Sequence, residues 1–380
     1  AVLPGTGGLT RITDKRRVRR DLADVFCSVE EGVRGRRAVE WRLVDEVVPP
    51  SAWEARVAER ARDFAAQTDR PRDAKGVALP WLERVAEGDT IRWSSVAVEL
   101  DRVGRRATIT VAGPDAAPPA SLEAAKDAAF WPLRMARELE DAILHLRTNE
   151  PELGLWALKT RGAAEAVLAY DAFLDAHAAD WFIREVRLNL KRVLKRLDVT
   201  SRSLIALVEP GSCFAGTLAE LAFAADRALM FSGDTPAPAT IALSPLNFGA
   251  YPMGNGLTRL QARFWGAPDS LGVAQEKIGA PIAAENAESL GLVTIAYDET
   301  DWEDEVRILL EERASFSPDA LTGMEANLRF VGPETMESRI FGRLTAWQNW
   351  IFQRPNSVGE TGALKLYGTG IQPSFDRARV

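Results

Sequence analysis

The feature that most constrains this chain is a phrase near its start that returns far along the sequence. Residues 4–11 read PGTGGLTR and residues 252–259 read PMGNGLTR, and five of these eight positions are identical at an offset of 248. Residues 42–57 likewise parallel residues 291–306 at an offset of 249. Because solenoid repeats are only about 20–50 residues long, a repeat of this length indicates two tandem domains.

The first of the two copies is expected to be incomplete. About 160 residues, from Trp93 onward, precede the Pro-Gly loop of the second copy, whereas three precede that of the first. Residue 1 is therefore interpreted as a truncation point within a longer protein. We expect the C-terminal part of a first domain over 1–67, a polar, Pro-containing linker over 68–89, a second domain over 90–305, and C-terminal helices with a tail over 306–380.

Strand and helix patterns alternate through the second domain. The alternation of apolar residues predicts a β-hairpin around RVGRR, and the run SLIALVEP predicts a buried strand over Ser203–Pro210. A long amphipathic helix is expected from about 172 to 197, and in the first copy a helix is expected to run into a short strand that ends at Pro49. This order predicts an α/β layer fold with crossover connections.

Composition limits the classes of function. The net charge is −7, which argues against a nucleic-acid partner because phosphate binding needs a basic face. The basic run Asp14–Arg20 is interpreted as a solvated helix face, with contact to an anionic ligand as the alternative. No apolar run approaches the roughly 18 residues of a membrane helix. Two cysteines, Cys27 and Cys213, fit neither a metal site nor a disulfide framework, which favours a reducing, cytoplasmic setting.

One segment carries the chemistry. Residues 204–225 predict a strand, a turn with Gly211 and Gly216, and then a helix from about Thr217. A small-residue loop that opens onto a helix N-terminus leaves backbone N–H groups unpaired, with the positive end of the helix dipole behind them. Such an arrangement can hold an oxyanion.

These residues resemble the crotonase (enoyl-CoA hydratase/isomerase) superfamily. Its glycine-rich loop and following E-L-A-x-A-x-D pattern are similar to Gly211 and Gly216–Asp226, and its P-G-x-G-G-x-x-R loop is similar to both repeated phrases. The resemblance implies an α/β fold of two tandem crotonase-like domains, each a spiral of βαβ units, the first incomplete, plus a helical C-terminal extension and tail. It also implies a homodimer.

The resemblance further implies a coenzyme A thioester as substrate. No separate cofactor and no metal are expected, because coenzyme A is part of the substrate. The backbone N–H groups of Tyr170 and Thr217 would polarise the thioester carbonyl in the second domain. The substrate-binding loop of the first domain would consist of Pro4, Gly5, Gly7 and Gly8.

The second copy departs from the pattern of the superfamily. Thr217 and Leu218 stand where the loop has glycines, and Pro245 stands where a second catalytic glutamate is found. Glu220 matches the first catalytic glutamate, but a lone carboxylate at the start of a helix is explained more readily by stabilisation of the helix dipole. We therefore expect a degenerate second domain. The first-domain counterparts of Glu220 and Pro245 fall before residue 1, so the main glutamate pair is expected upstream. An ordinary enoyl-CoA hydratase or isomerase and a non-catalytic scaffold remain alternatives.

Overall fold

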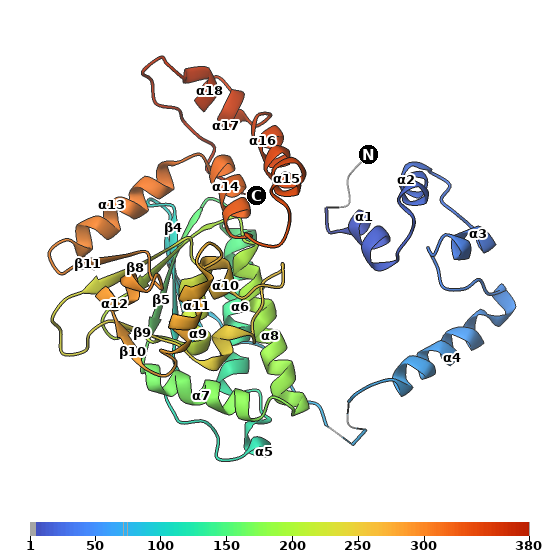
Figure 1. Cartoon of the computed structure of the whole chain (residues 1–380), viewed down its shortest axis with the longest axis horizontal. Helices are drawn as coiled ribbons and strands as arrows, with labels where there is room; N and C mark the ends of the chain where they lie inside the picture. Colours follow the sequence, from blue (N-terminus) through green and yellow to red (C-terminus); the bar gives the residue numbers. More distant parts are fainter. Residues whose placement is uncertain (1–4, 71, 74, 380) are drawn as a thin grey trace. The chain divides into compact units, whose positions relative to one another are not determined.

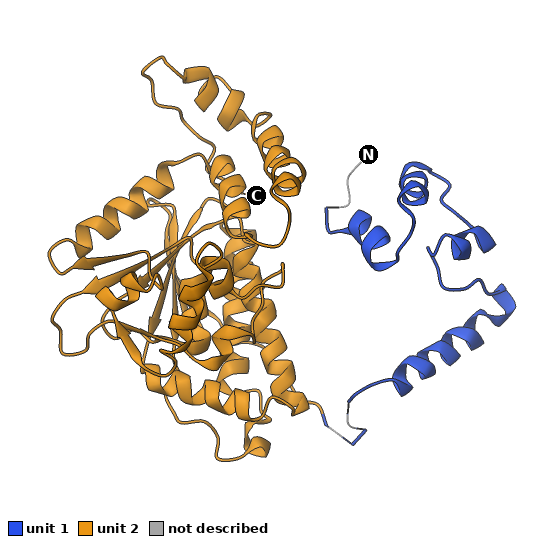
Figure 2. Cartoon of the chain, in the orientation of Figure 1, with its two compact units in different colours: residues 1–75 blue, residues 76–380 orange. Residues whose placement is uncertain are grey.

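The computed structural model describes residues 5–70, 72–73 and 75–379, so Pro4 lies outside the described residues. The chain divides into two compact units, residues 1–75 and 76–380 (Figures 1 and 2). The division falls inside the expected linker of residues 68–89. That linker also contains a short strand, β1 (Val85–Glu87).

Unit 1 consists of short helices. They are α1 (Gly8–Thr10), the π-helical η1 (Arg11–Lys15), α2 (Arg20–Ser28), α3 (Gly35–Glu40), the 3₁₀ turn η2 (Pro50–Ala52) and α4 (Trp53–Ala66). The described part of unit 1 contains no strand, so the strand expected before Pro49 is absent. A strand needs a neighbour to accept its hydrogen bonds, and the described residues of unit 1 provide none.

The helices of unit 1 recur in unit 2 at the spacing of the sequence repeat. α3 and α12 (Ala284–Ser289) have six residues each, and α4 and α13 (Trp302–Ser315) have 14 residues each. Both pairs start 249 positions apart, which is the offset of the surrounding sequence. η1 and α10 (Arg259–Arg263) have five residues each. They start 248 positions apart, which is the offset of the repeated Pro-Gly phrase.

The turn that follows α3 also matches the turn that follows α12. Leu43 and Leu292 each donate the backbone N–H to the carbonyl five residues earlier, at 2.9 and 2.8 Å. The preceding residues, Arg42 and Gly291, have φ angles of 63° and 73°, in the left-handed region that ends many helices. The repeated sequence therefore produces the same local structure twice.

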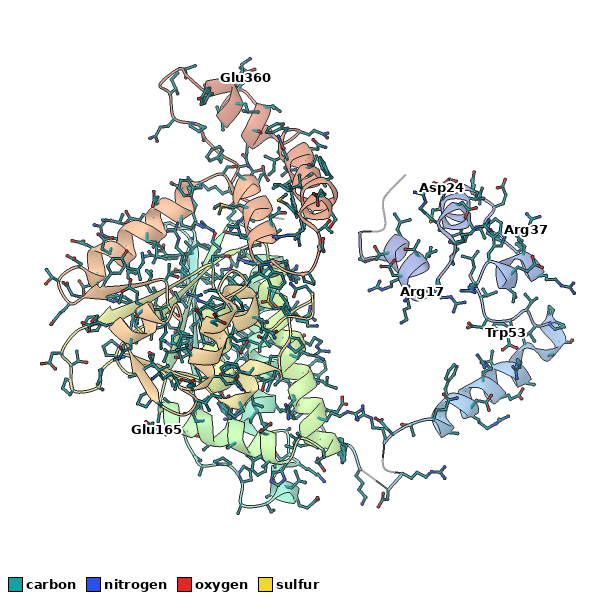
Figure 3. The ribbon with its side chains drawn as sticks, in the orientation of Figure 1. Arg17, Asp24, Arg37, Trp53, Glu165 and Glu360 are labelled. Carbon is teal, nitrogen blue, oxygen red and sulfur yellow. The ribbon has the colours of Figure 1, made fainter. Side chains whose placement is uncertain are left out.

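Unit 1 buries few apolar side chains. Among its described residues only Val18, Ala23 and Ala38 belong to the buried apolar set. The Trp53 side chain, at the first turn of α4 (Figure 3), is 58% exposed, and that of Phe64 is 63% exposed. An apolar surface of this kind is typical of a face that packs against other protein.

Unit 2 contains an eight-stranded mixed sheet in the order β1-β2-β3-β4-β5-β6-β8-β11. The first four strands pair antiparallel, and the strands from β4 to β11 run parallel to one another. The other strands of this sheet are β2 (Thr90–Arg92), β3 (Val96–Asp101), β4 (Arg106–Ala112), β5 (Leu155–Arg161), β6 (Ser203–Val208), β8 (Arg227–Ser232) and β11 (Ile295–Asp298).

A second sheet has three short strands in the order β10-β9-β7: β7 (Phe214–Ala215), β9 (Thr240–Ala242) and β10 (Pro281–Ala283). The remaining helices before α12 are α5 (Leu122–Ala125), α6 (Trp131–Asn149), α7 (Ala164–Ala176), α8 (Trp181–Asp198), α9 (Gly216–Ala224), η3 (Pro245–Phe248) and α11 (Pro268–Gln275).

The main sheet is covered on both faces. Every residue of β6 is buried, as expected for a continuous apolar run in a parallel strand. The side chains that point to one face join a core with α6, α8 and α9. On the other face, Trp302, Leu309 and Leu310 of α13 pack against Leu155 and neighbouring strand residues. The expected hairpin is present as β3 and β4.

One helix prediction was wrong. The single helix expected over about 172–197 is two helices, α7 and α8. The break is stabilised by Asp180, whose carboxylate accepts hydrogen bonds from the N–H groups of Phe182 and Ile183 at 2.8 and 3.4 Å. An Asp at this position caps a new helix N-terminus, and this local signal outweighs the continuous apolar periodicity.

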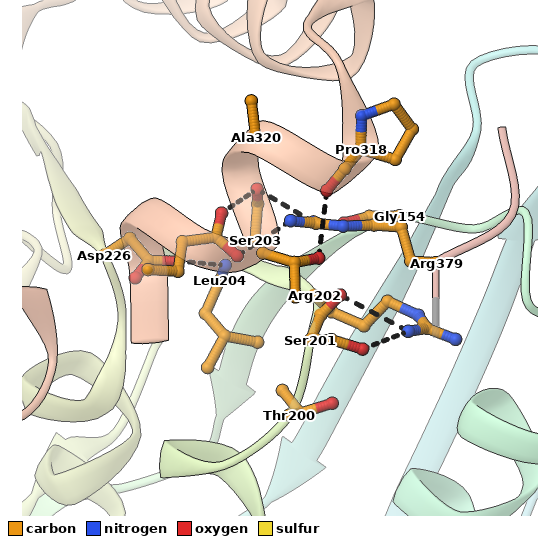
Figure 4. Close-up of polar contacts among 12 residues, drawn as sticks. Gly154, Thr200, Ser201, Arg202, Ser203, Leu204, Asp226, Pro318, Ala320 and Arg379 are labelled. Atoms are coloured by element: carbon orange, nitrogen blue, oxygen red, sulfur yellow. Dashed lines mark hydrogen bonds and ion pairs between the residues drawn. The ribbon is translucent and has the colours of Figure 1, made fainter. Parts of the chain in front are cut away.

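The C-terminal region is helical, as expected, and its last described residues return to the sheet. Its helices are α14 (Pro318–Leu328), α15 (Met336–Arg339), the π-helical η4 (Ile340–Leu344), α16 (Thr345–Ile351), α17 (Pro355–Val358) and α18 (Ala363–Leu366). The buried Arg379 guanidinium then donates to the Gly154 carbonyl at 2.6 Å, to Glu325 at 2.9 Å and to Ser203 Oγ at 3.2 Å (Figure 4).

Across the described ranges, no helix is both long enough and apolar enough to cross a bilayer.

We expect Arg379→Ala to lower the free energy of unfolding of the chain by about 2–4 kcal/mol, because it removes one cation from a buried carboxylate and one of the two donors to the Gly154 carbonyl, the other being the Ser203 N–H. Arg377→Ala is the matched control, since Arg377 is exposed two residues away. Urea unfolding followed by tryptophan fluorescence measures both variants. If the two variants have equal urea midpoints, the Arg379 contacts do not stabilise the packing of the C-terminal residues.

Candidate functional site

The loop between β6 and α9 lies at the carboxyl end of the parallel strands. Two of its glycines, Gly211 and Gly216, have φ angles of 79° and 45°. At Gly216 the requirement for glycine is also steric, because a Cβ atom there would lie 1.9 Å from Asp171 Oδ2. Glycine at position 216 therefore allows the loop to lie in close contact with Asp171 of α7.

An internal carboxylate occupies the N-terminus of α9. Asp171 Oδ2 accepts a hydrogen bond from the Thr217 N–H at 2.8 Å and from Ser244 Oγ at 2.6 Å, and Asp171 Oδ1 accepts one from Thr217 Oγ1 at 2.5 Å. Asp171 is 1% exposed. All three donors are neutral, and the positive end of the α9 dipole lies behind them. This is the arrangement that the sequence predicted for an oxyanion, with a side chain of the protein in the place of the ligand.

The environment of Asp171 opposes its ionisation. Burial raises the pKa of the Asp171 carboxyl to about 6, although the hydrogen bonds from Ser244 and Thr217 pull it down and the charge of Glu220 adds to the rise. Asp171 is therefore mostly ionised at neutral pH and takes up a proton in mildly acidic solution.

Both predicted donors in unit 2 are already engaged. The Thr217 N–H is bonded to Asp171. Tyr170 lies in the middle of α7, where backbone N–H groups are used by the helix itself, and its ring packs on Phe130 and Trp131 at centroid distances of 5.7 and 5.3 Å. Substrate binding by Tyr170 and Thr217 stays a prediction, and it requires that the Asp171 carboxylate first leave the Thr217 N–H.

Glu220 belongs to a buried ionic group. Its Oε2 accepts from Arg259 Nη1 at 2.8 Å and its Oε1 accepts from Asn247 Nδ2 at 2.7 Å. Arg259 also binds both oxygens of Asp198, at 3.0 and 2.7 Å. The side chains of these ion pairs are 1–2% exposed. Burial raises the pKa of Glu220, and the Arg259 charge opposes that rise. In this arrangement Glu220 stabilises the packing of α9 against α10.

Pro245, expected in place of a second carboxylate, begins the 3₁₀ turn η3. Ser244 and Asn247 cap this turn, and the Ser244 N–H donates to Asn247 Oδ1 at 2.9 Å. Asn247 also donates to the Gly216 carbonyl at 2.9 Å. Sequence reasoning missed Asp171, Ser244 and Asn247, although Asp171 directly follows the predicted donor Tyr170.

The glycine loop of unit 1 is described from Gly5 onward. Gly7, with a φ of 98°, precedes the short helix α1 that begins at Gly8. Arg11, the counterpart of Arg259, donates to the Thr6 carbonyl at 2.7 Å. The expected substrate-binding role of this loop stays a prediction.

In the basic run of residues 14–20, Arg19 pairs with Asp21 on the surface, as expected for a solvated face.

Metal ligands and disulfides are absent from the described ranges. In them, no three His, Cys, Asp or Glu side chains gather in a way that could hold a metal ion. Cys27 is exposed, Cys213 is buried, and both are free thiols.

Comparison with solved structures identifies the fold. An enoyl-CoA hydratase from Bacillus anthracis matches with a TM-score of 0.53 and 14% identity, over 74% of this chain and 99% of that one. An enoyl-CoA hydratase/isomerase from Cupriavidus metallidurans CH34 matches with a TM-score of 0.52 and 18% identity, over 74% and 95%. The protein thus has the crotonase-like α/β fold of the enoyl-CoA hydratases.

No protein-family model matches the chain. A curated relative, the benzoyl-CoA-dihydrodiol lyase of Aromatoleum evansii, is 54% identical over 381 aligned residues, which cover all of this chain and 68% of that protein. The chain belongs to the benzoyl-CoA-dihydrodiol lyase family.

The pKa of Asp171 leads to a prediction about pH and stability. A carboxyl that binds its proton more tightly when folded stabilises the fold below its unfolded pKa, and this contribution is lost as the pH rises through about 6. Relative to Asp171→Asn, which does not titrate, the wild-type chain should therefore gain about 2 kcal/mol of unfolding free energy between pH 7 and pH 4.

Urea unfolding at both pH values measures this difference. Glu165→Gln is the control, because Glu165 is an exposed carboxylate at the start of the same helix (Figure 3). A gap between wild type and Asp171→Asn that stays constant with pH would contradict the prediction.

Proposed function

We propose that this protein takes part in the ring opening of 2,3-epoxybenzoyl-CoA during aerobic benzoate degradation. In this reaction the epoxide of benzoyl-CoA and two waters give 3,4-dehydroadipyl-CoA semialdehyde and formate. The observation that carries the proposal is the 54% identity along the whole chain to the Aromatoleum benzoyl-CoA-dihydrodiol lyase. The crotonase-like fold supports a coenzyme A thioester as the substrate.

The proposed chemistry depends on a polarised thioester. Backbone N–H groups bound to the thioester oxygen stabilise the negative charge that develops on it, so the thioester serves as the electron sink. Carboxylates then move protons as the waters add and the carbon–carbon bond breaks. Coenzyme A enters as part of the substrate, and the proposal includes no further cofactor.

In this proposal unit 2 does not supply the proton-transferring carboxylates. Glu220 is held by Arg259 and Asn247, and the donor at Thr217 is occupied by Asp171. Both oxygens of the Glu220 carboxylate are engaged by the Arg259 and Asn247 side chains, so neither is free to contact a substrate proton. Unit 2 would therefore serve packing and assembly, in line with a degenerate second copy.

Unit 1 would then contribute to the working site as the C-terminal part of a first crotonase-like domain. The matching bounds of α3 with α12 and of α4 with α13 support this role. We propose that Gly5, Gly7 and Gly8, together with Pro4, line the substrate there. The paired glutamates would come from the sequence that precedes this part of the domain.

Two other functions fit part of the observations. A general enoyl-CoA hydratase or isomerase is favoured by the fold relatives. A non-catalytic scaffold is favoured by the filled donor position at Thr217. The proposed protein is a cytoplasmic homodimer with no nucleic-acid partner, in keeping with a net charge of −7.

Formate release from 2,3-epoxybenzoyl-CoA tests the proposal. We would compare the 380-residue chain with the same chain extended by its own upstream coding sequence, and use crotonyl-CoA as a second substrate. Formate from the extended protein alone is the expected result. Hydration of crotonyl-CoA without formate would identify a general hydratase, and no turnover of either substrate by a folded protein would favour the scaffold.

The role of Glu220 gives a further prediction. In a formate-releasing protein, Glu220→Gln should lower the melting temperature but leave kcat within about twofold of the wild type, because the mutation breaks an ion pair and removes no reacting group. A catalytic Glu220 would instead cost a factor of about 10² or more in kcat. The control is Glu285→Gln, at an exposed carboxylate in the first turn of α12.

A further inference from the structure

Unit 2 contains a cavity of about 360 Å³ beside the amino end of β8. Its wall includes Asp226 and Arg227 at the start of β8, Arg263 at the end of α10, and Glu325 of α14. The last residues of α9 also line it, so it lies roughly 10 Å along that helix from Thr217. Its volume lies within the range of about 300–1,000 Å³ that is usual for small-molecule sites.

The charges on the cavity wall do not balance, since five arginines face three carboxylates. Each carboxylate is held by an arginine of the same wall, in the pairs Asp198 with Arg259, Asp226 with Arg329 and Glu325 with Arg313. Two cations, Arg227 and Arg263, remain without a carboxylate partner in the described ranges of the chain. The cavity therefore carries a surplus of positive charge.

Arg263 is the more constrained of these two cations. Its Nε–H donates to the Gly291 carbonyl, and this bond fixes the direction of the guanidinium. Its two Nη groups have no acceptor among the residues that the structure describes. Arg263 is part-buried, and burial lowers the pKa of its guanidinium. A cation in such a place is stabilised by an anion that accepts its free N–H groups.

The rest of the wall is apolar. Phe223, Met253, Met324 and Leu328 line the same cavity. An inorganic ion would leave these side chains uncovered, whereas a small organic anion would fill the volume and meet both kinds of surface.

We propose that this cavity is a binding site for a small organic molecule with a carboxylate or phosphate group. The Nη groups of Arg263 bind the oxyanion, Arg227 adds a second positive charge, and Phe223 with the two methionines contacts the apolar part. The site lies at the other end of α9 from the loop that carries Thr217, and it does not depend on the proposed thioester chemistry.

The test is a thermal-shift titration of the full chain with sodium benzoate and with sodium phosphate, each against sodium chloride at equal ionic strength. We expect at least one of the two anions to raise the melting temperature in a saturable manner. In Arg263→Gln the apparent Kd should be weaker by about tenfold or more, because a charge-assisted contact is lost. Arg263→Lys, which keeps the charge, should bind more tightly than Arg263→Gln.

The control is Arg307→Gln, since Arg307 is an exposed arginine of α13 that pairs with Asp304 and Glu311. It should respond to the anions as the wild type does. A response to benzoate alone would identify an organic carboxylate site, and a response to phosphate alone would identify a phosphate site. If neither anion exceeds chloride with the wild type, or if Arg263→Gln binds as well as the wild type, the proposal is wrong. Should Arg263→Gln fail to fold, Arg227→Gln and the wild-type titration decide the question.

Discussion

The arrangement of unit 2 depends on one buried cation. The Arg259 guanidinium joins Asp198 at the end of α8, Glu220 inside α9 and the start of α10, so three helices meet at a single charge. Buried ions are stabilising only when every partner is present, because an unpaired charge in the interior costs several kcal/mol. α9 carries the loop at its N-terminus, and the position of that loop therefore depends on Arg259. The same arginine in the first copy, Arg11, has a backbone carbonyl as its acceptor.

The N-terminus of α9 has the geometry of an oxyanion site, and a side chain of the protein occupies it. The helix dipole, the left-handed glycine and the converging donors remain, and the Asp171 carboxylate satisfies them. A buried carboxylate is costly without hydrogen-bond donors, and buried donors are costly without an acceptor. The carboxylate and the donors therefore hold α7 against the loop, and this contact gives a structural purpose to residues that resemble a binding site.

The repeated segments form matching helices in the two copies because helices are stabilised by local hydrogen bonds and caps. Helices α3 and α12 begin and end at matched positions, although their surroundings differ. The strand β11 has no counterpart before Pro49, since a strand exists only beside another strand. The contact of Asp171 with Thr217 spans 46 residues and could not be read from local patterns. The Asp180 cap, by contrast, was a local signal within the expected helix.

The return of the tail to the sheet has a consequence for the order of folding. Arg379 donates to the Gly154 carbonyl across 225 positions, beside the starts of β5 and β6. Contacts of such long sequence separation form late, because a large loop must close before they contribute. The Gly154 carbonyl therefore lacks its Arg379 donor until the last turns of the chain have been made, although Arg313 and Glu325 already contact Ser203. For that interval the sheet is complete, and the buried Glu325 carboxylate has Arg313 but not yet Arg379 as its partner.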